Sequence, residues 1–61
     1  MANKPGVSVE MIKAARAAAG LTQFQASEII GAGHRTWQDW EQGKRNMPPA
    51  KFALFVLLTK G

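Results

Sequence analysis

The sequence predicts an all-α protein, a compact bundle of four or five short helices. Three observations indicate this class. Apolar residues recur at the three- and four-residue spacing of amphipathic helices, and no stretch shows the alternation of a half-buried strand. Glycines follow successive helical stretches where a helix is expected to stop. With 61 residues and no cysteine, the chain has room for one domain, 1–61, which must be stabilised by tight helix packing or a partner subunit.

The first helix is predicted from Ser8, a suitable N-cap, to about Ala19, with Gly20 as its stop. Residues 1–7, which include a proline and a glycine, are expected to form a flexible arm. The residues expected on the inward side of this helix are Val9, Ile12, Arg16 and Ala19.

A second helix is predicted from the N-cap Thr22 to about Ile30, and a third over about 34–42. The tight turn Gly31-Ala32-Gly33 joins them, and Gly43 ends the third helix. This is the layout of a helix-turn-helix. The expected inner residues of the second helix are Leu21, Phe24, Ser27 and Ile30.

The third helix carries two opposed stripes. Trp37 and Trp40 lie three residues apart on one side, and we interpret them as core rather than as base-stacking groups. The other side is polar and is expected to contact a ligand; its residues are Arg35, Gln38, Asp39 and Gln42.

A basic loop leads to a last helix over about 49–60, in which Pro49 suits the first helical position. Every residue from Phe52 to Leu58 is apolar, so this helix is expected both to close the core and to form a homodimer seam. The expected core residues are Phe52, Phe55 and Val56. The residues expected to contact the second copy in the homodimer are Leu54, Leu57 and Leu58.

Charge indicates a polyanionic partner, because eight Lys and Arg against four Asp and Glu give a net charge of +4. Nucleic acid is favoured over a membrane, since the longest apolar run is far shorter than the roughly 20 residues of a span. The N-terminal residues lack the apolar segment of a signal peptide, so a cytoplasmic location is expected.

Enzymatic activity is not expected. The four acidic residues form no evident acid/base pair, and there is no Cys, no Tyr and a single His. That His without thiols cannot assemble a zinc site, and the glycine turn lacks the pattern of a dinucleotide loop. We therefore expect no metal, no cofactor and no small-molecule ligand.

Several residues align with the motif of a known family without insertions or deletions. They are Leu21-Thr22-Gln23, Gly31, Trp40-Glu41 and Gly43-Lys44-Arg45. In these the chain resembles Cro/CI-type (Xre-like) helix-turn-helix regulators, which implies a lambda-repressor-like DNA-binding fold. The string from Arg35 to Ala50 is similar to that of very small phage and mobile-element regulators, a subgroup that includes anti-CRISPR-associated repressors. Ala26, Ser27, Gly33 and Trp37 depart from the usual pattern.

The resemblance implies that the third helix lies in the DNA major groove. His34 and Arg35 then reach base edges, and Gln38 and Asp39 follow on the same stripe. Chemistry agrees, because Arg can donate two hydrogen bonds to guanine and Asp can accept one from cytosine.

The residues that the resemblance assigns to the phosphate backbone are Gln23, Thr36, Lys44, Arg45 and Asn46. It also aligns Arg16 and Glu41 with a buried charge pair that ties the first helix to the third.

The expected function is sequence-specific binding of double-stranded DNA as a transcriptional regulator. A homodimeric repressor, reading inverted half-sites about 34 Å apart, is favoured, and its small size favours autoregulation of a phage or anti-CRISPR operon. The alternative is an antitoxin-like protein-interaction module that docks through the apolar last helix. The operator, the target gene, the direction of regulation and the host process stay open.

Overall fold

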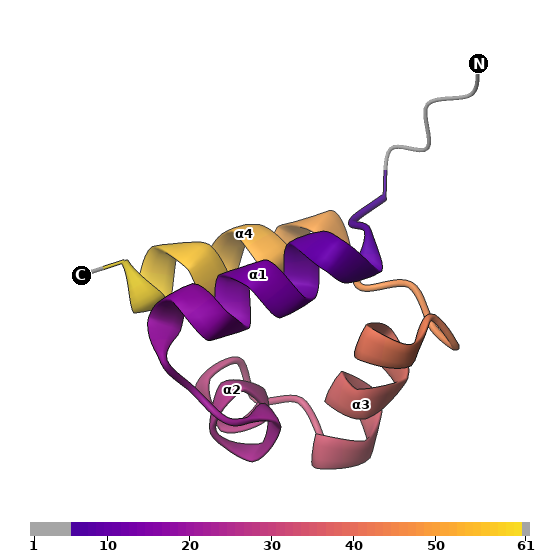
Figure 1. Ribbon diagram of the computed structural model, residues 1–61, viewed down its shortest axis with the longest axis horizontal. Helices are drawn as coiled ribbons and strands as arrows, with labels where there is room; N and C mark the ends of the chain where they lie inside the picture. The colour runs from indigo at the N-terminus through magenta and orange to yellow at the C-terminus, as the bar shows by residue number, and fades with distance from the viewer. Residues whose placement is uncertain (1–5, 61) are drawn as a thin grey trace.

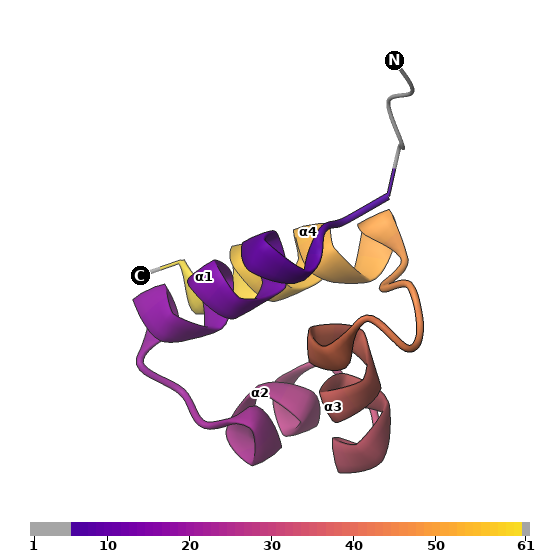
Figure 2. The same ribbon diagram turned by 45° about the vertical axis from the view of Figure 1, so that its right-hand side comes forward.

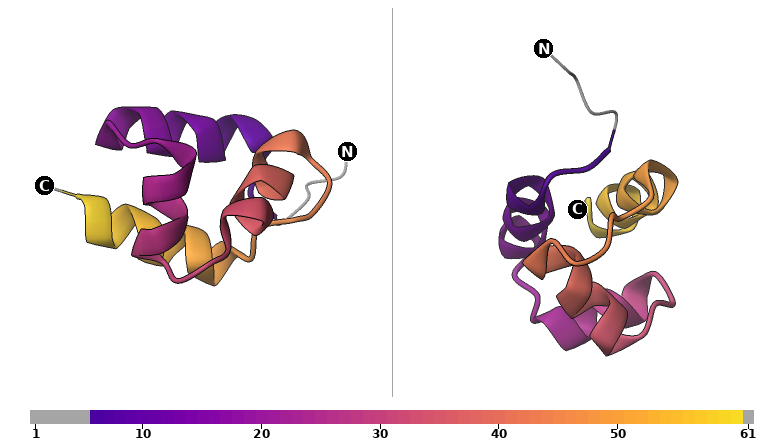
Figure 3. Two further views of the ribbon diagram at one scale, coloured as in Figure 1. Left: turned by 90° about the horizontal axis from the view of Figure 1, so that it is seen from below. Right: turned by 90° about the vertical axis from the view of Figure 1, so that its right-hand side faces the viewer.

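The computed structural model describes residues 6–60, which form helices and turns but no strand. The helices are α1 (Val9–Ala19), α2 (Gln23–Ile29), α3 (His34–Gln42) and α4 (Pro49–Thr59). α1 and α4 lie side by side and run in the same direction, while α2 and α3 lie together beneath them (Figures 1 and 2). The end-on view in Figure 3 shows the same two layers. The all-α prediction is confirmed.

Local hydrogen bonds explain where α1 and α2 begin. The Ser8 hydroxyl accepts a hydrogen bond of 3.1 Å from the backbone N–H of Met11. Thr22 and Gln25 form a reciprocal capping box, in which each side-chain oxygen accepts from the other residue's backbone N–H, at 3.1 and 3.0 Å. Both caps were predicted because their signals lie within four residues of sequence.

Glycine conformations explain where α2 and α3 end. Gly31 and Gly43 have φ of +72° and +79°, in the left-handed backbone region that residues other than glycine rarely adopt. α2 and α4 each stop one residue earlier than predicted, at Ile29 and Thr59.

The core lies between the two layers. The indole of Trp37 is fully buried, with its ring centroid 5.0 Å from that of Phe55 and 5.7 Å from that of Trp40. Trp37 and Trp40 are therefore core residues, as predicted. The complete buried apolar cluster comprises Ile12, Ala26, Ile30, Trp37, Trp40, Met47 and Phe55.

Two predicted core residues lie outside it. Phe24 is 53% exposed and Val56 is 41% exposed, so both assignments were wrong. Ser27 and Ile30 are buried as predicted, but on α2 the residues that join Ser27 on the inner side are Ala26, which is buried, and Gln23, which is half-buried, while Phe24 is turned outward. Val9, Ala19 and Leu21, which were also expected inside, are half-buried.

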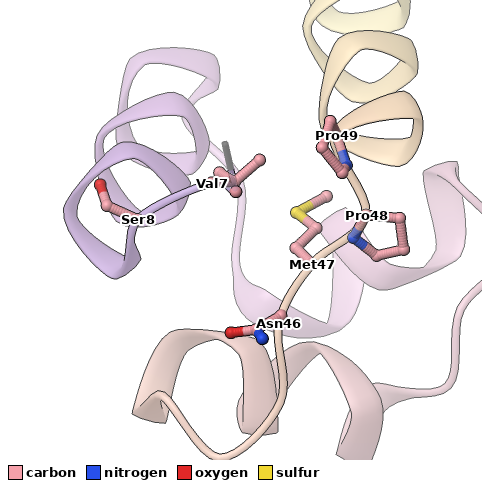
Figure 4. A pocket seen from close by; sticks show the side chains of 7 residues that line it. Val7, Ser8, Asn46, Met47, Pro48 and Pro49 are labelled. Atoms are coloured by element: carbon pink, nitrogen blue, oxygen red, sulfur yellow. The ribbon is translucent and has the colours of Figure 1, made fainter. Parts of the chain in front are cut away.

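Val7 packs against the core, although it was predicted to belong to a flexible arm; residues 1–5 of that arm lie outside the described residues. It precedes the Ser8 cap, and Ile12 lies four residues after that cap, which are the positions of a hydrophobic staple. Val7 and the buried Met47 line an open hollow of about 480 Å³ between the start of α1 and the loop before α4 (Figure 4).

None of the helices in residues 6–60 has the length and apolar character needed to cross a bilayer.

Candidate nucleic-acid interface

α3 has one buried face and one accessible face. Trp37, Trp40 and Glu41 are buried, at 0%, 5% and 4% exposure. The accessible face begins with the exposed His34 and Arg35. It continues with half-buried polar residues, Thr36, Gln38 and Asp39. The five residues predicted to read bases or to lie near the backbone on this helix thus remain accessible from outside.

The buried Glu41 carboxylate holds three helices together. Arg16, from α1, donates from Nε to Oε2 at 2.6 Å and from Nη2 to Oε1 at 3.1 Å. Trp37 donates its indole N–H to Oε2 at 2.7 Å, and Gln23, from α2, donates to Oε1 at 3.0 Å. The expected pair between Arg16 and Glu41 is therefore present, and it belongs to a larger network than predicted.

The ionisation of this network follows from these contacts. Burial alone would raise the pKa of Glu41, but the hydrogen bonds from Arg16, Gln23 and Trp37 and the charge of Arg16 outweigh it, so this pKa lies below its ordinary value. The hydrogen bond to Glu41 is the main reason that the pKa of Arg16 is raised. Both groups are charged at neutral pH.

Gln23 occupies the position that the family resemblance assigns to a phosphate contact. Its side-chain nitrogen carries two hydrogens and donates one to Glu41. The other can serve a second acceptor. The same bond fixes the start of α2 relative to α3, so Gln23 has both a structural contact and capacity for a ligand.

The loop after α3 presents cationic and amide side chains. Lys44, Arg45 and Asn46 are exposed, and the backbone N–H groups of Lys44 and Arg45 donate to the carbonyl of Asp39 at 2.9 and 3.4 Å. Within residues 6–60 the one ion pair joins Arg16 to Glu41. The charges of Arg35, Lys44 and Arg45 are therefore not neutralised by a carboxylate of the described chain.

An aromatic pair lies where α2 meets the start of α3. The rings of Phe24 and His34 pack edge to face, with centroids 5.5 Å apart and planes at 81°. Sequence reasoning missed this contact because it assigned Phe24 to the core.

The outer surface of α4 is apolar. The three residues predicted for a dimer seam, Leu54, Leu57 and Leu58, are 42%, 67% and 55% exposed. They do not belong to the buried cluster, so they are accessible to a second chain.

Sequence reasoning also missed two donors to Glu41. Trp37 precedes Glu41 by four residues, a spacing that places both on one side of a helix, and this was the available signal for their contact. Gln23 lies 18 residues from Glu41 in sequence, and no local pattern connects them.

Comparison with known proteins gives one partial relationship. No family model matches the chain. A stretch of 44 residues, 72% of this chain, is 50% identical to the type II methyltransferase M.MspI of Moraxella sp.. The stretch covers only 10% of that methyltransferase, so this chain is similar to a small part of a much longer protein.

Proposed function

We propose that the protein binds double-stranded DNA sequence-specifically and acts as a transcriptional regulator, a homodimeric repressor of the lambda-repressor-like type. In this proposal α2 and α3 form the helix-turn-helix, and α3 enters the major groove. The observation that carries it is the division of α3 into two faces. Trp37, Trp40 and Glu41 are buried on the inner face, which leaves an accessible polar face that begins with His34 and Arg35.

Each part of the accessible surface has a role in this proposal. Arg35 and Asp39 read base edges, since their groups complement guanine and cytosine. His34 and Gln38 contribute to the same reading surface. Contacts to the phosphate backbone come from Gln23, Thr36, Lys44, Arg45 and Asn46, and supply affinity without sequence information.

A binding role also agrees with the partial relationship to a methyltransferase. The matched stretch is a tenth of that enzyme, a length compatible with an accessory module. We propose that this chain has no enzymatic activity of its own.

The dimer is proposed from α4. Its exposed leucines, Leu54, Leu57 and Leu58, give one chain an apolar surface that a two-fold related copy can cover. Two copies would then present their α3 helices to inverted half-sites about 34 Å apart. We propose that the protein's own concentration controls binding, as in an autorepressor of a phage or anti-CRISPR operon.

Selection from a random duplex library tests the proposal. The purified full chain is incubated with the library at physiological salt, and the bound fraction is sequenced after several rounds. An inverted repeat is the expected result, and its position in the source genome would identify the regulated promoter. Recovery of sequences without a common motif would reject sequence-specific binding and favour a protein-interaction role for α4.

A further inference from the structure

The exposed ring of Phe24 is the strongest unexplained feature of the surface. Every other Phe or Trp side chain of the protein is buried or half-buried, whereas Phe24 is 53% exposed. The core does not need it, because α2 contributes Ala26 and Ser27 to the interior and Ile30, directly after α2, is buried as well. Single exposed apolar residues are common on protein surfaces, so the position of this ring, more than its exposure, indicates a ligand.

The contact between Phe24 and His34 fixes where this ring lies. His34 is the first residue of α3, and its ring packs against that of Phe24 at 5.5 Å with nearly perpendicular planes. In a helix-turn-helix the first residues of the recognition helix contact base edges. Phe24 therefore lies beside the base-reading end of α3, although it belongs to α2.

We propose that the Phe24 ring contacts the C5-methyl group of a pyrimidine in the major groove, an inference that rests on the proposed DNA-binding function. That methyl group is the apolar feature of the major-groove edge, and Phe is among the side chains suited to contact it. Two bases can supply it, thymine and 5-methylcytosine. Phe24 is thus a specificity-determining residue in addition to the polar residues of α3.

The test uses the selected operator and removes or adds the methyl group alone. Each thymine is replaced in turn by uracil in both half-sites, each cytosine is replaced by 5-methylcytosine, and binding is measured by fluorescence anisotropy. The wild-type protein is compared with Phe24→Ala, with Phe24→Gln as a second variant. Ile29→Ala is the matched control, since Ile29 is an exposed apolar residue of the same helix. Thermal unfolding of each variant is followed by circular dichroism.

For wild type, we expect one position per half-site where the methyl group improves binding about fourfold, the effect of burying one such group. If affinity falls when thymine is replaced by uracil, thymine supplies the methyl group. If affinity rises when cytosine is replaced by 5-methylcytosine, the modified base supplies it. At that position Phe24→Ala and Phe24→Gln should bind the operators with and without the methyl group with equal affinity. Ile29→Ala should keep the affinity difference seen for wild type. If one of the two Phe24 variants does not fold, the other alone provides the test.

Two failures are distinguishable. If the wild-type protein selects an operator, but the methyl groups have the same effect in wild type and in the folded Phe24 variants at every position, the role of Phe24 is wrong and the proposed function stands. If the wild-type protein selects no motif, both proposals are overturned.

Discussion

The indole Nε1 of Trp37 donates a hydrogen bond of 2.7 Å to Oε2 of Glu41, one helical turn further along α3. Trp37 is one of the positions at which the chain departs from the pattern of the resembled family. Here the tryptophan fills the core and also supplies a donor to a buried carboxylate that ties α3 to α1 and α2. The orientation of the proposed reading helix therefore depends on a polar contact inside the core.

Replacing Trp37 by Phe tests this contact, because the substitution removes the indole N–H and keeps an aromatic ring in the core. We expect a loss of about 1–3 kcal/mol in the free energy of unfolding, since the carboxylate loses a partner in a buried place. Urea denaturation monitored by circular dichroism measures it. Trp40→Phe is the control, because Trp40 is not among the donors to Glu41, and an equal loss in both variants would contradict a special role for the Trp37 hydrogen bond.

Acid should weaken the fold through Glu41. Its pKa is lowered in the folded state, so the unfolded chain binds a proton more readily, and the stability that the carboxylate provides is lost as pH falls below about 4.3, the ordinary value for Glu. Urea denaturation from pH 7 to pH 2 measures this loss. Arg16 stays charged throughout, because the pKa of this guanidinium is raised.

The Glu41→Gln variant separates this effect from general acid denaturation. It should cost about 3–5 kcal/mol at pH 7, because Arg16 is left without its charge partner in a partly buried place, and its remaining stability should depend less on pH than that of wild type. Glu28→Gln, at an exposed carboxylate, should behave as wild type. A negligible cost of Glu41→Gln at neutral pH would mean that the pair contributes little.

Local signals predicted much of the fold. Ser8, Thr22 and Pro49 mark helix starts through contacts or backbone preferences within one turn, and the tryptophan spacing on α3 identified the face that packs. Phe24 was placed inside because hydrophobicity favours a phenyl ring over an amide. The structure turns Gln23 inward instead, because its amide reaches Glu41, a partner that no spacing on α2 reveals.

The candidate site was predicted less fully from the residues alone. The polar stripe of α3 follows from helical spacing, but the pairing of Arg16 with Glu41 came only from the family resemblance, because 25 residues separate them. Burial of Met47 was missed as well. It lies in a basic loop, where no helical spacing connects it to the buried cluster to which it belongs.

Lys44→Ala should weaken binding to all DNA sequences alike. If the ammonium group neutralises one phosphate, its loss should reduce the slope of log affinity against log salt by about one. Anisotropy titrations with the operator and with an unrelated duplex at several salt concentrations measure both effects. Lys13→Ala is the control, because Lys13 is an exposed lysine of α1 outside the proposed interface. An equal change in affinity and salt slope in the two variants would mean that Lys44 acts only through the net charge of the protein.

Arg35→Ala should instead change specificity. Loss of a bidentate contact to guanine should remove the preference at one base pair of each half-site, worth about 1–3 kcal/mol. Binding to a panel of single-substituted operators measures it, and binding to unrelated DNA should change much less. A uniform loss at all sequences would reassign Arg35 to the phosphate backbone.

Leu57→Lys should dissociate the proposed dimer without unfolding the chain. Leu57 is 67% exposed in the single chain, so the substitution should change the stability of the monomer by no more than about 0.5 kcal/mol. In a seam the new ammonium would be buried without a partner, which should raise the dimer dissociation constant by at least about tenfold. Sedimentation velocity over a range of concentrations measures it, with Ile29→Lys as the control on a helix outside the seam. A wild-type chain that stays monomeric at every concentration would reject α4 as a homodimer surface and leave it free for a different protein partner.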